Sequence, residues 1–354
     1  MLSFAPLFER FASMPVTSRA LRMALYCLLI LAGAALAGGW AMRQAERHAL
    51  EESARRGPEQ LSLYANSLHT LIERYRALPA VLALDAELVN ALSNPVTPEV
   101  QAALNRKLER INGAAQSSTL ELLDSSGLAV AASNWNTSNS YVGHNYGFRP
   151  YFSQTRSQGS GSFYAVGVTS GIPGHFLSSA VLDADGRFLG AMVVKLEFPQ
   201  LEREWSHGND ILLVSDARGI VFIANQPGWR YRLLRPLDDS DRNEISVTRQ
   251  YHNQPLTLMN THTLRSFAEN SSLTRVEGPD GPADYLWGSL PLSPEGWTLH
   301  LLRRPANVAE DIRNAALAGA GLWLTVVFLG LFLLQRWRLA RLRQRNREEL
   351  EQLV

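Results

Sequence analysis

Cysteine and lysine are both scarce in this sequence, and each shortage is informative. The one cysteine, Cys27, lies inside a long apolar run, so the rest of the chain has no disulfide. The large region after that run must therefore be held by an ordinary hydrophobic core. The two lysines are Lys107 and Lys195, so arginine carries almost all of the positive charge.

Motifs for catalysis are missing as well. The sequence has no glycine-rich loop of the kind that cradles phosphates, and its eight histidines are scattered without the spacing of metal ligands. We therefore expect no catalytic residue, no metal site, no cofactor and no nucleic-acid partner in this chain.

Two long apolar runs are present, Met23–Met42 and Ala315–Leu334. Each has the roughly 20 residues that a helix needs to cross a bilayer, so both are predicted to span a membrane. A cleaved signal peptide is the alternative for the first run. Its apolar core is longer than that of a signal peptide, however, and no clear small-residue cleavage site is present.

Arginines near the ends of these runs predict the orientation, because basic residues favour the cytoplasmic side. They are Arg10, Arg19 and Arg22 before the first run and Arg336, Arg338, Arg341, Arg343, Arg345 and Arg347 after the second. Residues 1–22 and 335–354 are thus predicted to be cytoplasmic, and residues 43–314 to lie outside, in the periplasm if the cell is Gram-negative. We expect a multi-pass protein of a bacterial inner membrane. Near-heptad leucines, Leu339, Leu342 and Leu350, indicate the start of a signalling coiled coil in the tail.

Residues 43–112 have a helical pattern, with apolar positions such as Leu61, Leu68 and Ile72 at helical spacing. A long helix followed by shorter ones is predicted. Pro58, Pro79 and Pro95 are expected to mark first turns or breaks within this region.

After about Ser117 the pattern changes to short strands joined by Asp-x-x-Gly turns, at Asp124, Asp183 and Asp216. The hairpins at the first and third turns match best, which suggests that one unit occurs twice. A chance similarity of two hairpins is the alternative. We predict an α+β fold with one sheet domain in residues 113–205 and a second in residues 206–314.

A segment rich in Asn, Tyr, Gly and Ser follows the first hairpin, and it has the composition of a binding site. In its NYGFRPYF stretch, Tyr146 precedes Arg149 by three residues, so a helical turn would place phenol and guanidinium on one side. A guanidinium beside a hydroxyl suits a carboxylate. The alternative is that Arg149 is an ordinary solvated arginine.

Lys195 lies within the apolar strand GAMVVKLEF, where it either contacts a ligand or extends outward beside Glu197 on a solvated face. Small hydrogen-bond donors occur in VGVTSG at Thr169, Ser170 and Gly171, and Tyr151 and Tyr164 are candidate pocket walls. Two separate cations suit a ligand with two carboxylates, because burying either charge unpaired is costly.

The stretches SNWN, VGHNYGFRPYF and FYAVGVTSGIPGHFLSS resemble the sensor domain of the Dct-type histidine kinases that sense four-carbon dicarboxylates. The resemblance extends from the first apolar run to the second. It implies a long helix carrying two PAS-like (double Cache) domains. The membrane-distal one, residues 113–205, would bind succinate, fumarate or malate, and residues 206–314 would form the membrane-proximal one. By motif it implies that Tyr146, Arg149, Thr169, Ser170, Gly171 and Lys195 bind the carboxylates. His144 and Gly147 stand where variation within the family is expected.

The function that we expect is the sensor part of a two-component kinase, acting as a homodimer and signalling to a response regulator. The kinase and its ATP site would lie in a region that this chain lacks, so we expect either a fragment or a naturally truncated receptor. The sensor half of a chemoreceptor or of a cyclic-dinucleotide enzyme, and a membrane-anchored solute-binding module, are the alternatives.

Overall fold

The computed structural model describes residues 16–267, 270–305 and 309–352, which divide into two compact units. The first contains the described residues up to Ser53 and those from Pro305 onward, and the second extends from Ala54 to Arg304. Residues 1–15 of the predicted cytoplasmic N-terminus, with Arg10, lie outside the described part of the chain.

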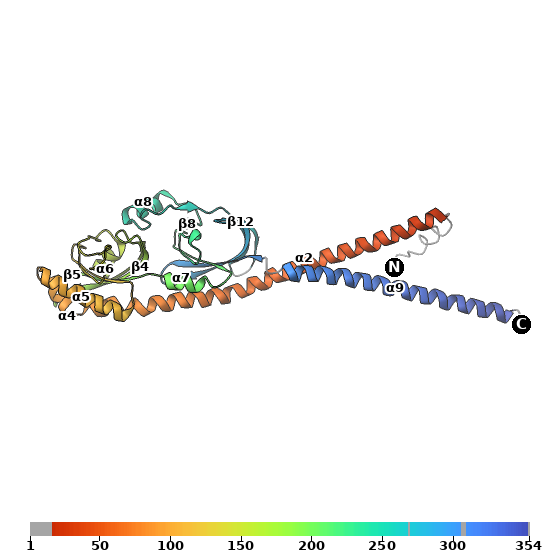
Figure 1. Cartoon of the computed structure of the whole chain (residues 1–354), viewed down its shortest axis with the longest axis horizontal. Coiled ribbons are helices and arrows are strands. Elements are labelled where there is room, and N and C mark those ends of the chain that lie inside the picture. The colour runs from red at the N-terminus through yellow and green to blue at the C-terminus, as the bar shows by residue number, and fades with distance from the viewer. Residues whose placement is uncertain (1–15, 268–269, 306–308, 353–354) are drawn as a thin grey trace. The chain divides into compact units, whose positions relative to one another are not determined.

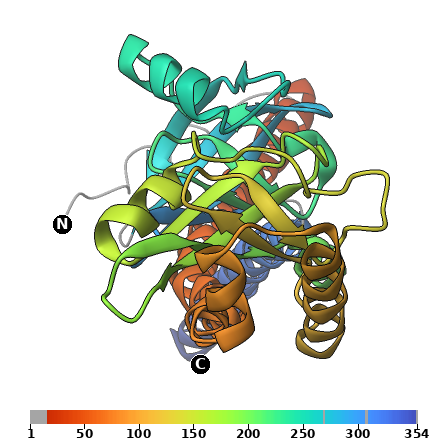
Figure 2. The same cartoon turned by 90° about the vertical axis from the view of Figure 1, so that its left-hand side faces the viewer.

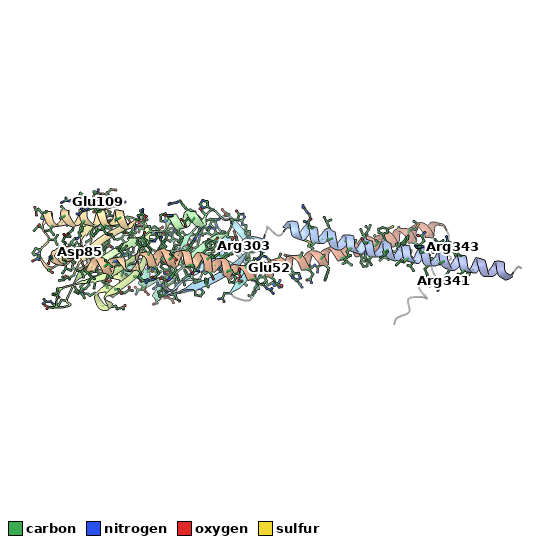
Figure 3. All side chains as sticks on the ribbon, turned by 90° about the horizontal axis from the view of Figure 1, so that it is seen from below. Glu52, Asp85, Glu109, Arg303, Arg341 and Arg343 are labelled. Atoms are coloured by element: carbon green, nitrogen blue, oxygen red, sulfur yellow. The ribbon has the colours of Figure 1, made fainter. Side chains whose placement is uncertain are left out.

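The first unit consists of the N-terminal part of α2 (Val16–Arg76) and of α9 (Ala309–Gln352), two helices that are long and apolar enough to cross a membrane. The predicted spans Met23–Met42 and Ala315–Leu334 are helical throughout. Many of their large apolar side chains are exposed, as expected of surfaces that face lipid. Arg341 and Arg343, labelled in Figure 3, are exposed on the later part of α9, and the Arg341 guanidinium lies 3.5 Å from the centre of the Trp337 ring.

Small residues allow these two helices to approach closely. A Cβ atom on Gly33 would lie 2.4 Å from the ring of Trp323, and one on Gly319 would lie 2.6 Å from the Cβ atom of Ala41. The Trp323 indole also donates a hydrogen bond to the Ile30 carbonyl at 3.1 Å. Small residues at a helix contact are typical of membrane helix pairs.

The second unit begins with the rest of α2, whose apolar stripe of Leu61, Leu68 and Ile72 is buried. The helix continues through Pro58, so the prediction of a first turn or break there is wrong. An internal proline costs about 3 kcal/mol, and the buried stripe that follows it stabilises the continuous helix. The predictions for the other two prolines are confirmed: Pro79 lies in the first turn of α3, and Pro95 follows the end of α4.

Three shorter helices follow: α3 (Leu78–Ala83), α4 (Ala86–Ser93) and α5 (Pro98–Ala115). The Asp85 side chain caps α4 by accepting from the backbone N–H groups of Glu87 and Leu88. Asp85 and Glu109 lie at this helical end of the second unit, and Arg303 lies toward its other end (Figure 3).

The first sheet has five antiparallel strands in the order β2-β1-β5-β4-β3. Their bounds are β1 (Thr119–Asp124), β2 (Ala129–Ala132), β3 (Ser160–Val166), β4 (Pro173–Leu182) and β5 (Phe188–Leu196). Helices α3 to α5 pack on one face, through a core that includes Leu88, Leu108 and Leu122. The other face, which we call the pocket face, packs against α6 (Pro150–Gln158) and the loop before it.

The second sheet has six strands in the order β10-β11-β12-β13-β6-β7. They are β6 (Ile211–Ser215), β7 (Val221–Ala224), β10 (Thr261–Ser266), β11 (Ser271–Gly278), β12 (Gly281–Leu292) and β13 (Trp297–Arg303), and α7 (Pro199–Trp205) connects the sheets. Between β7 and β10 the chain forms η1 (Pro227–Trp229), β8 (Arg232–Leu233), α8 (Asp239–Thr248) and β9 (Thr257–Leu258). Within the second unit, α8 lies on the side opposite to α2–α5 (Figures 1 and 2).

The predicted repeat is confirmed by the strand order. In each sheet the hairpin that begins the unit pairs through its first strand with the last strand of the unit. The turns also match: Asp124 and Asp216 each accept from the backbone N–H groups two and four residues later, around a glycine with positive φ. The turn at Asp183, between β4 and β5, has the same bonds, so the shared strand order and not the turns favours the repeat over a chance similarity. The predicted α+β class is confirmed.

Candidate ligand-binding site

A small cavity lies on the pocket face of the first sheet, within the second unit. Its volume is about 10 Å³, roughly the room for one water molecule. The lining residues are Glu121, Tyr141, Tyr146, Arg149, Tyr151, Gly167, Val168, Thr169 and Phe176. Three residues of the predicted site, Tyr146, Arg149 and Thr169, are thus brought together here.

Arg149 stands at the N-cap of α6 and is 1% exposed, so it is no solvated surface arginine. Its guanidinium donates to three backbone carbonyls: Val166 at 2.7 Å, Thr248 at 2.9 Å and Arg249 at 3.1 Å. It also lies 5.2 Å from the centre of the Phe148 ring. Burial lowers the pKa of Arg149, yet an arginine stays protonated. A buried positive charge is therefore held in place by main-chain oxygen atoms.

Lys195, on β5, is also 1% exposed, so the alternative of a solvated face is wrong. Its Nζ atom donates to Glu197 Oε1 at 2.6 Å and to the hydroxyls of Tyr141 and Ser170, each at 3.3 Å. The same atom lies 5.9 Å from the centre of the Phe176 ring, which lines the cavity. Lys195 thus reaches the edge of the same site and is paired there with one carboxylate.

Hydroxyl groups occupy the space between these cations. The hydroxyls of Tyr146 and Thr169 share a hydrogen bond at 2.7 Å, and Tyr141 donates to Ser170 at 3.2 Å. Burial raises the pKa of Tyr146, so its phenol stays protonated and can donate. Gly171 has a φ of +67° and forms the turn next to these residues, with its N–H bonded to the Gly167 carbonyl at 2.7 Å. A Cβ atom on Gly171 would touch nothing, so no neighbouring atom requires a glycine here. The positive φ is what favours glycine at this position.

The structure does not bring Tyr164 to the cavity. Its hydroxyl donates to the Phe222 carbonyl at 3.1 Å, and its ring packs against Phe222 and Trp297 in the core of the second sheet. Tyr151, the other candidate wall, does line the cavity and stacks on Phe176 with 5.1 Å between the ring centres.

Glu121 is the one acidic lining residue, and the motif reasoning did not identify it. It is 2% exposed on β1, and its Oε1 atom accepts from the Tyr151 hydroxyl at 3.3 Å. Burial raises the pKa of Glu121 to about 7, against the opposing effects of that hydrogen bond, Lys195 and Arg149. The signal in the sequence was the same as for Lys195, a charged residue between aliphatic residues of one strand.

Two other features are weaker candidates. A larger hollow of about 510 Å³ is lined by α2, α7, the end of β5 and residues 116–118 before β1. Its arginine, Arg74, is exposed, so the hollow offers no desolvated positive charge. Among the described residues, His69, Glu73 and Glu295 have ligand atoms within 4.8 Å of one another. Both of these carboxylates are ion-paired with Arg76 instead.

Two similar sheets carried by one long helix, with buried cations on the pocket face of the first sheet, define a double PAS-like (dCache) sensor. Two candidate membrane helices flank this sensor along the chain. No protein-family model matches the chain.

Proteins of similar sequence and structure indicate which dCache sensors the chain resembles. The chain is 33% identical over 318 residues to the C4-dicarboxylate transport sensor protein DctB of Rhizobium meliloti, covering 89% of this chain and 50% of that protein. It is 29% identical over 285 residues to the protein of the same name from Pseudomonas aeruginosa, covering 80% of this chain and 43% of that one. The crystal structure of the sensor domain of the V. cholerae histidine kinase DctB matches with a TM-score of 0.64 and 26% identity, over 73% of this chain and 98% of that domain.

The chain is therefore a homologue of the DctB sensors, and the region between its two candidate membrane helices has the fold of the DctB sensor domain. The resemblance found in the motifs is confirmed. The chain spans about half the length of the curated relatives that it matches.

Proposed function

We propose that the chain is the sensor part of a two-component histidine kinase, which binds succinate, fumarate or malate and transmits the signal across the bacterial inner membrane. The observation that carries this proposal is the pair of fully buried cations, Arg149 and Lys195, beside one hydroxyl-lined cavity. A dicarboxylate supplies one anion for each of them. The names of the relatives, which are C4-dicarboxylate transport sensors, support the same ligand class.

Ligand entry requires rearrangement, because a cavity of about 10 Å³ admits no four-carbon acid. The turn from Gly167 to Ile172 is the natural part to move, since it carries Thr169 and Ser170 and closes on itself through the Gly167–Ile172 hydrogen bond at 3.0 Å. One ligand carboxylate would then replace Glu197 at Lys195. The other would approach the guanidinium of Arg149.

The contacts of Arg149 also suggest how the signal leaves the site. Thr248 and Arg249, which accept from its guanidinium, lie at the C-terminal end of α8 in the second repeat. The neighbouring Gln250 is bonded to the edge strand β3 of the first sheet, at Val166 and Tyr164. A carboxylate that competes for Arg149 would weaken the attachment of α8 to the first sheet. The ligand can shift the equilibrium between attached and released α8 only to the extent that it binds these two states with different affinity.

The remaining parts of the proposal concern the longer protein. The sensor would lie in the periplasm between the two membrane spans and would signal as a homodimer. The relatives are about twice as long as this chain, which leaves room for an ATP-dependent kinase region. That region would act on a response regulator.

Calorimetric titration of the full chain in lipid nanodiscs tests this function. Succinate, fumarate or malate should bind. Acetate should bind roughly 100-fold more weakly, because its single carboxylate can pair with only one of the two buried cations. Lys195→Met and Arg149→Met should each weaken binding of the dicarboxylate by about 100-fold, the equivalent of roughly 3 kcal/mol of charged hydrogen bonds.

Matched controls are available for both substitutions. Lys107→Met removes the other lysine, which pairs with Asp85 and Glu87 away from the cavity, and Arg156→Met removes an exposed arginine of α6. Both should bind like the parent protein. A Lys195→Met protein that binds succinate as tightly as the parent would overturn the proposed function.

A further inference from the structure

Glu121 has one oxygen atom that the proposed function does not use. Its Oε1 atom accepts from Tyr151, while its Oε2 atom is buried and has no hydrogen-bond partner among the described residues. A buried polar atom without a partner costs roughly 1–3 kcal/mol. Because Glu121 lines the cavity beside Arg149, this atom is placed to meet a ligand.

The charges around Glu121 decide which form of the carboxyl suits an anionic ligand. Arg149 faces it from α6 and Lys195 from β5, and Tyr151 and Tyr146 contribute neutral phenols. One of the two cations, Lys195, is already paired with Glu197. Once a ligand carboxylate has replaced Glu197 at Lys195, an ionised Glu121 together with the dianion would still set three negative charges against two positive ones in a site with little solvent. Like charges in such a site favour uptake of a proton.

We propose that Glu121 is a further ligand-binding residue that is protonated in the complex and donates a hydrogen bond from Oε2 to a ligand carboxylate, so that each bound dicarboxylate brings one proton. This inference rests on the proposed function and adds to it a linkage between binding and pH. The proton comes from solvent and enters as the acid binds. The raised pKa of Glu121, about 7 through burial, places the linkage close to neutral pH.

The sign of the linkage follows from this order of events. A bound dianion raises the pKa of Glu121 above its value in the free protein, so protons are taken up on binding between about pH 7 and that higher pKa. Below about pH 7 the carboxyl is already protonated, and the affinity for the dianion is constant. Between about pH 7 and the pKa of the complex, the affinity should fall by up to about tenfold for each pH unit.

Calorimetry of the full chain with succinate tests the inference. Titrations at pH 8 in buffers of different ionisation enthalpy should show uptake of close to one proton, and those at pH 6 close to none. Glu121→Gln keeps a donor but cannot titrate, so its affinity should stay flat from pH 7 to 9 and its proton uptake should vanish. His144→Gln is the control for the nearby exposed histidine, and it should keep the uptake of the parent.

The outcomes separate the inference from the function. Succinate binding at pH 8 without proton uptake, or a Glu121→Gln protein with the pH profile of the parent, would overturn the role of Glu121 and leave the proposed function standing. No binding at any pH would overturn both. The uptake is measured on the parent protein, so the inference remains testable even if Glu121→Gln fails to fold.

Discussion

The two sheets of the sensor share one strand order but carry different chemistry on corresponding faces. Leu120 of the first sheet bonds to Ser133 in the same way as Leu212 of the second bonds to Asn225, which aligns the two hairpins. From the strand pairings, Glu121 then corresponds to Leu213, and Lys195 corresponds to Leu302.

In the second sheet this face forms an ordinary core. Leu213 and Leu302 are fully buried and pack in one cluster with Trp229 and Tyr285. In the first sheet the same positions hold an acid and a base around a cavity. The difference teaches that the strand order does not determine the chemistry of a face: a few different side chains separate a candidate ligand site from a structural core.

The largest expected effect comes from transferring the first sheet's chemistry to the second. Leu302→Lys places a charge in an apolar cluster that offers no carboxylate in place of Glu197, so it should reduce the free energy of unfolding by more than about 3 kcal/mol. Leu302→Met, the volume-matched control, should cost under about 1.5 kcal/mol. Thermal unfolding followed by tryptophan fluorescence measures both, and equal stability of the two variants would break the comparison.

A smaller effect concerns pH, where the two sheets should respond with opposite signs. Burial lowers the pKa of His300, in the second sheet, from 6.5 to about 4, so its contribution to stability is present above pH 6.5 and is lost as the pH falls toward 4. Burial raises the pKa of Glu121 from 4.5 to about 7, so its contribution is present below pH 4.5 and is lost as the pH rises toward 7. Each slope is at most about 1.4 kcal/mol per pH unit.

Melting temperatures between pH 4 and 8 separate these two contributions. As the pH falls, the His300→Gln protein should lose less stability than the parent. As the pH rises from 4.5 to about 7, the Glu121→Gln protein should lose less stability than the parent. His175, which is buried against the second sheet's Trp297 and has a pKa lowered to about 3, stays in both variants as a common background. Parallel melting curves for parent and variants would contradict the opposite signs.

The smallest effect concerns the repeated turns. Asp124→Ala should cost about 1 kcal/mol, through loss of its bonds to backbone N–H groups. Asp216→Ala should cost about 2 kcal/mol, because Asp216 also accepts from the buried Tyr251 hydroxyl at 2.9 Å. Urea unfolding of the two variants measures the difference, and a larger cost at Asp124 would reverse the expected order.

Local patterns in the sequence predicted those features that depend on neighbouring residues. The Asp-x-x-Gly turns follow from side-chain bonds within five residues, and Tyr146 and Arg149 lie close because a turn bonds the Arg149 N–H to the Tyr146 carbonyl at 2.9 Å. Alternation could not place Lys195, because both faces of β5 are buried. The partners of Arg149 at Thr248 and Arg249 lie about a hundred residues away, beyond any local pattern.

The misplaced Tyr164 has a related cause. Tyr164 belongs to the edge strand β3, and its hydroxyl donates to the carbonyl of Phe222 in the second sheet. Nothing in the sequence of β3 itself indicates that the core of the second sheet lies beside it. Pro58 was misjudged because its helix is stabilised by the apolar stripe that follows it and not by intrinsic propensity.

The tight closure of the cavity has a kinetic consequence. A site with room for about one water molecule must open before a four-carbon acid can enter, so the opening rate sets an upper limit on the rate of association at high ligand concentration. The apparent dissociation constant then equals the intrinsic one divided by the open fraction. Substitutions in the turn from Gly167 to Ile172 that favour opening would therefore tighten binding without adding any contact to the ligand.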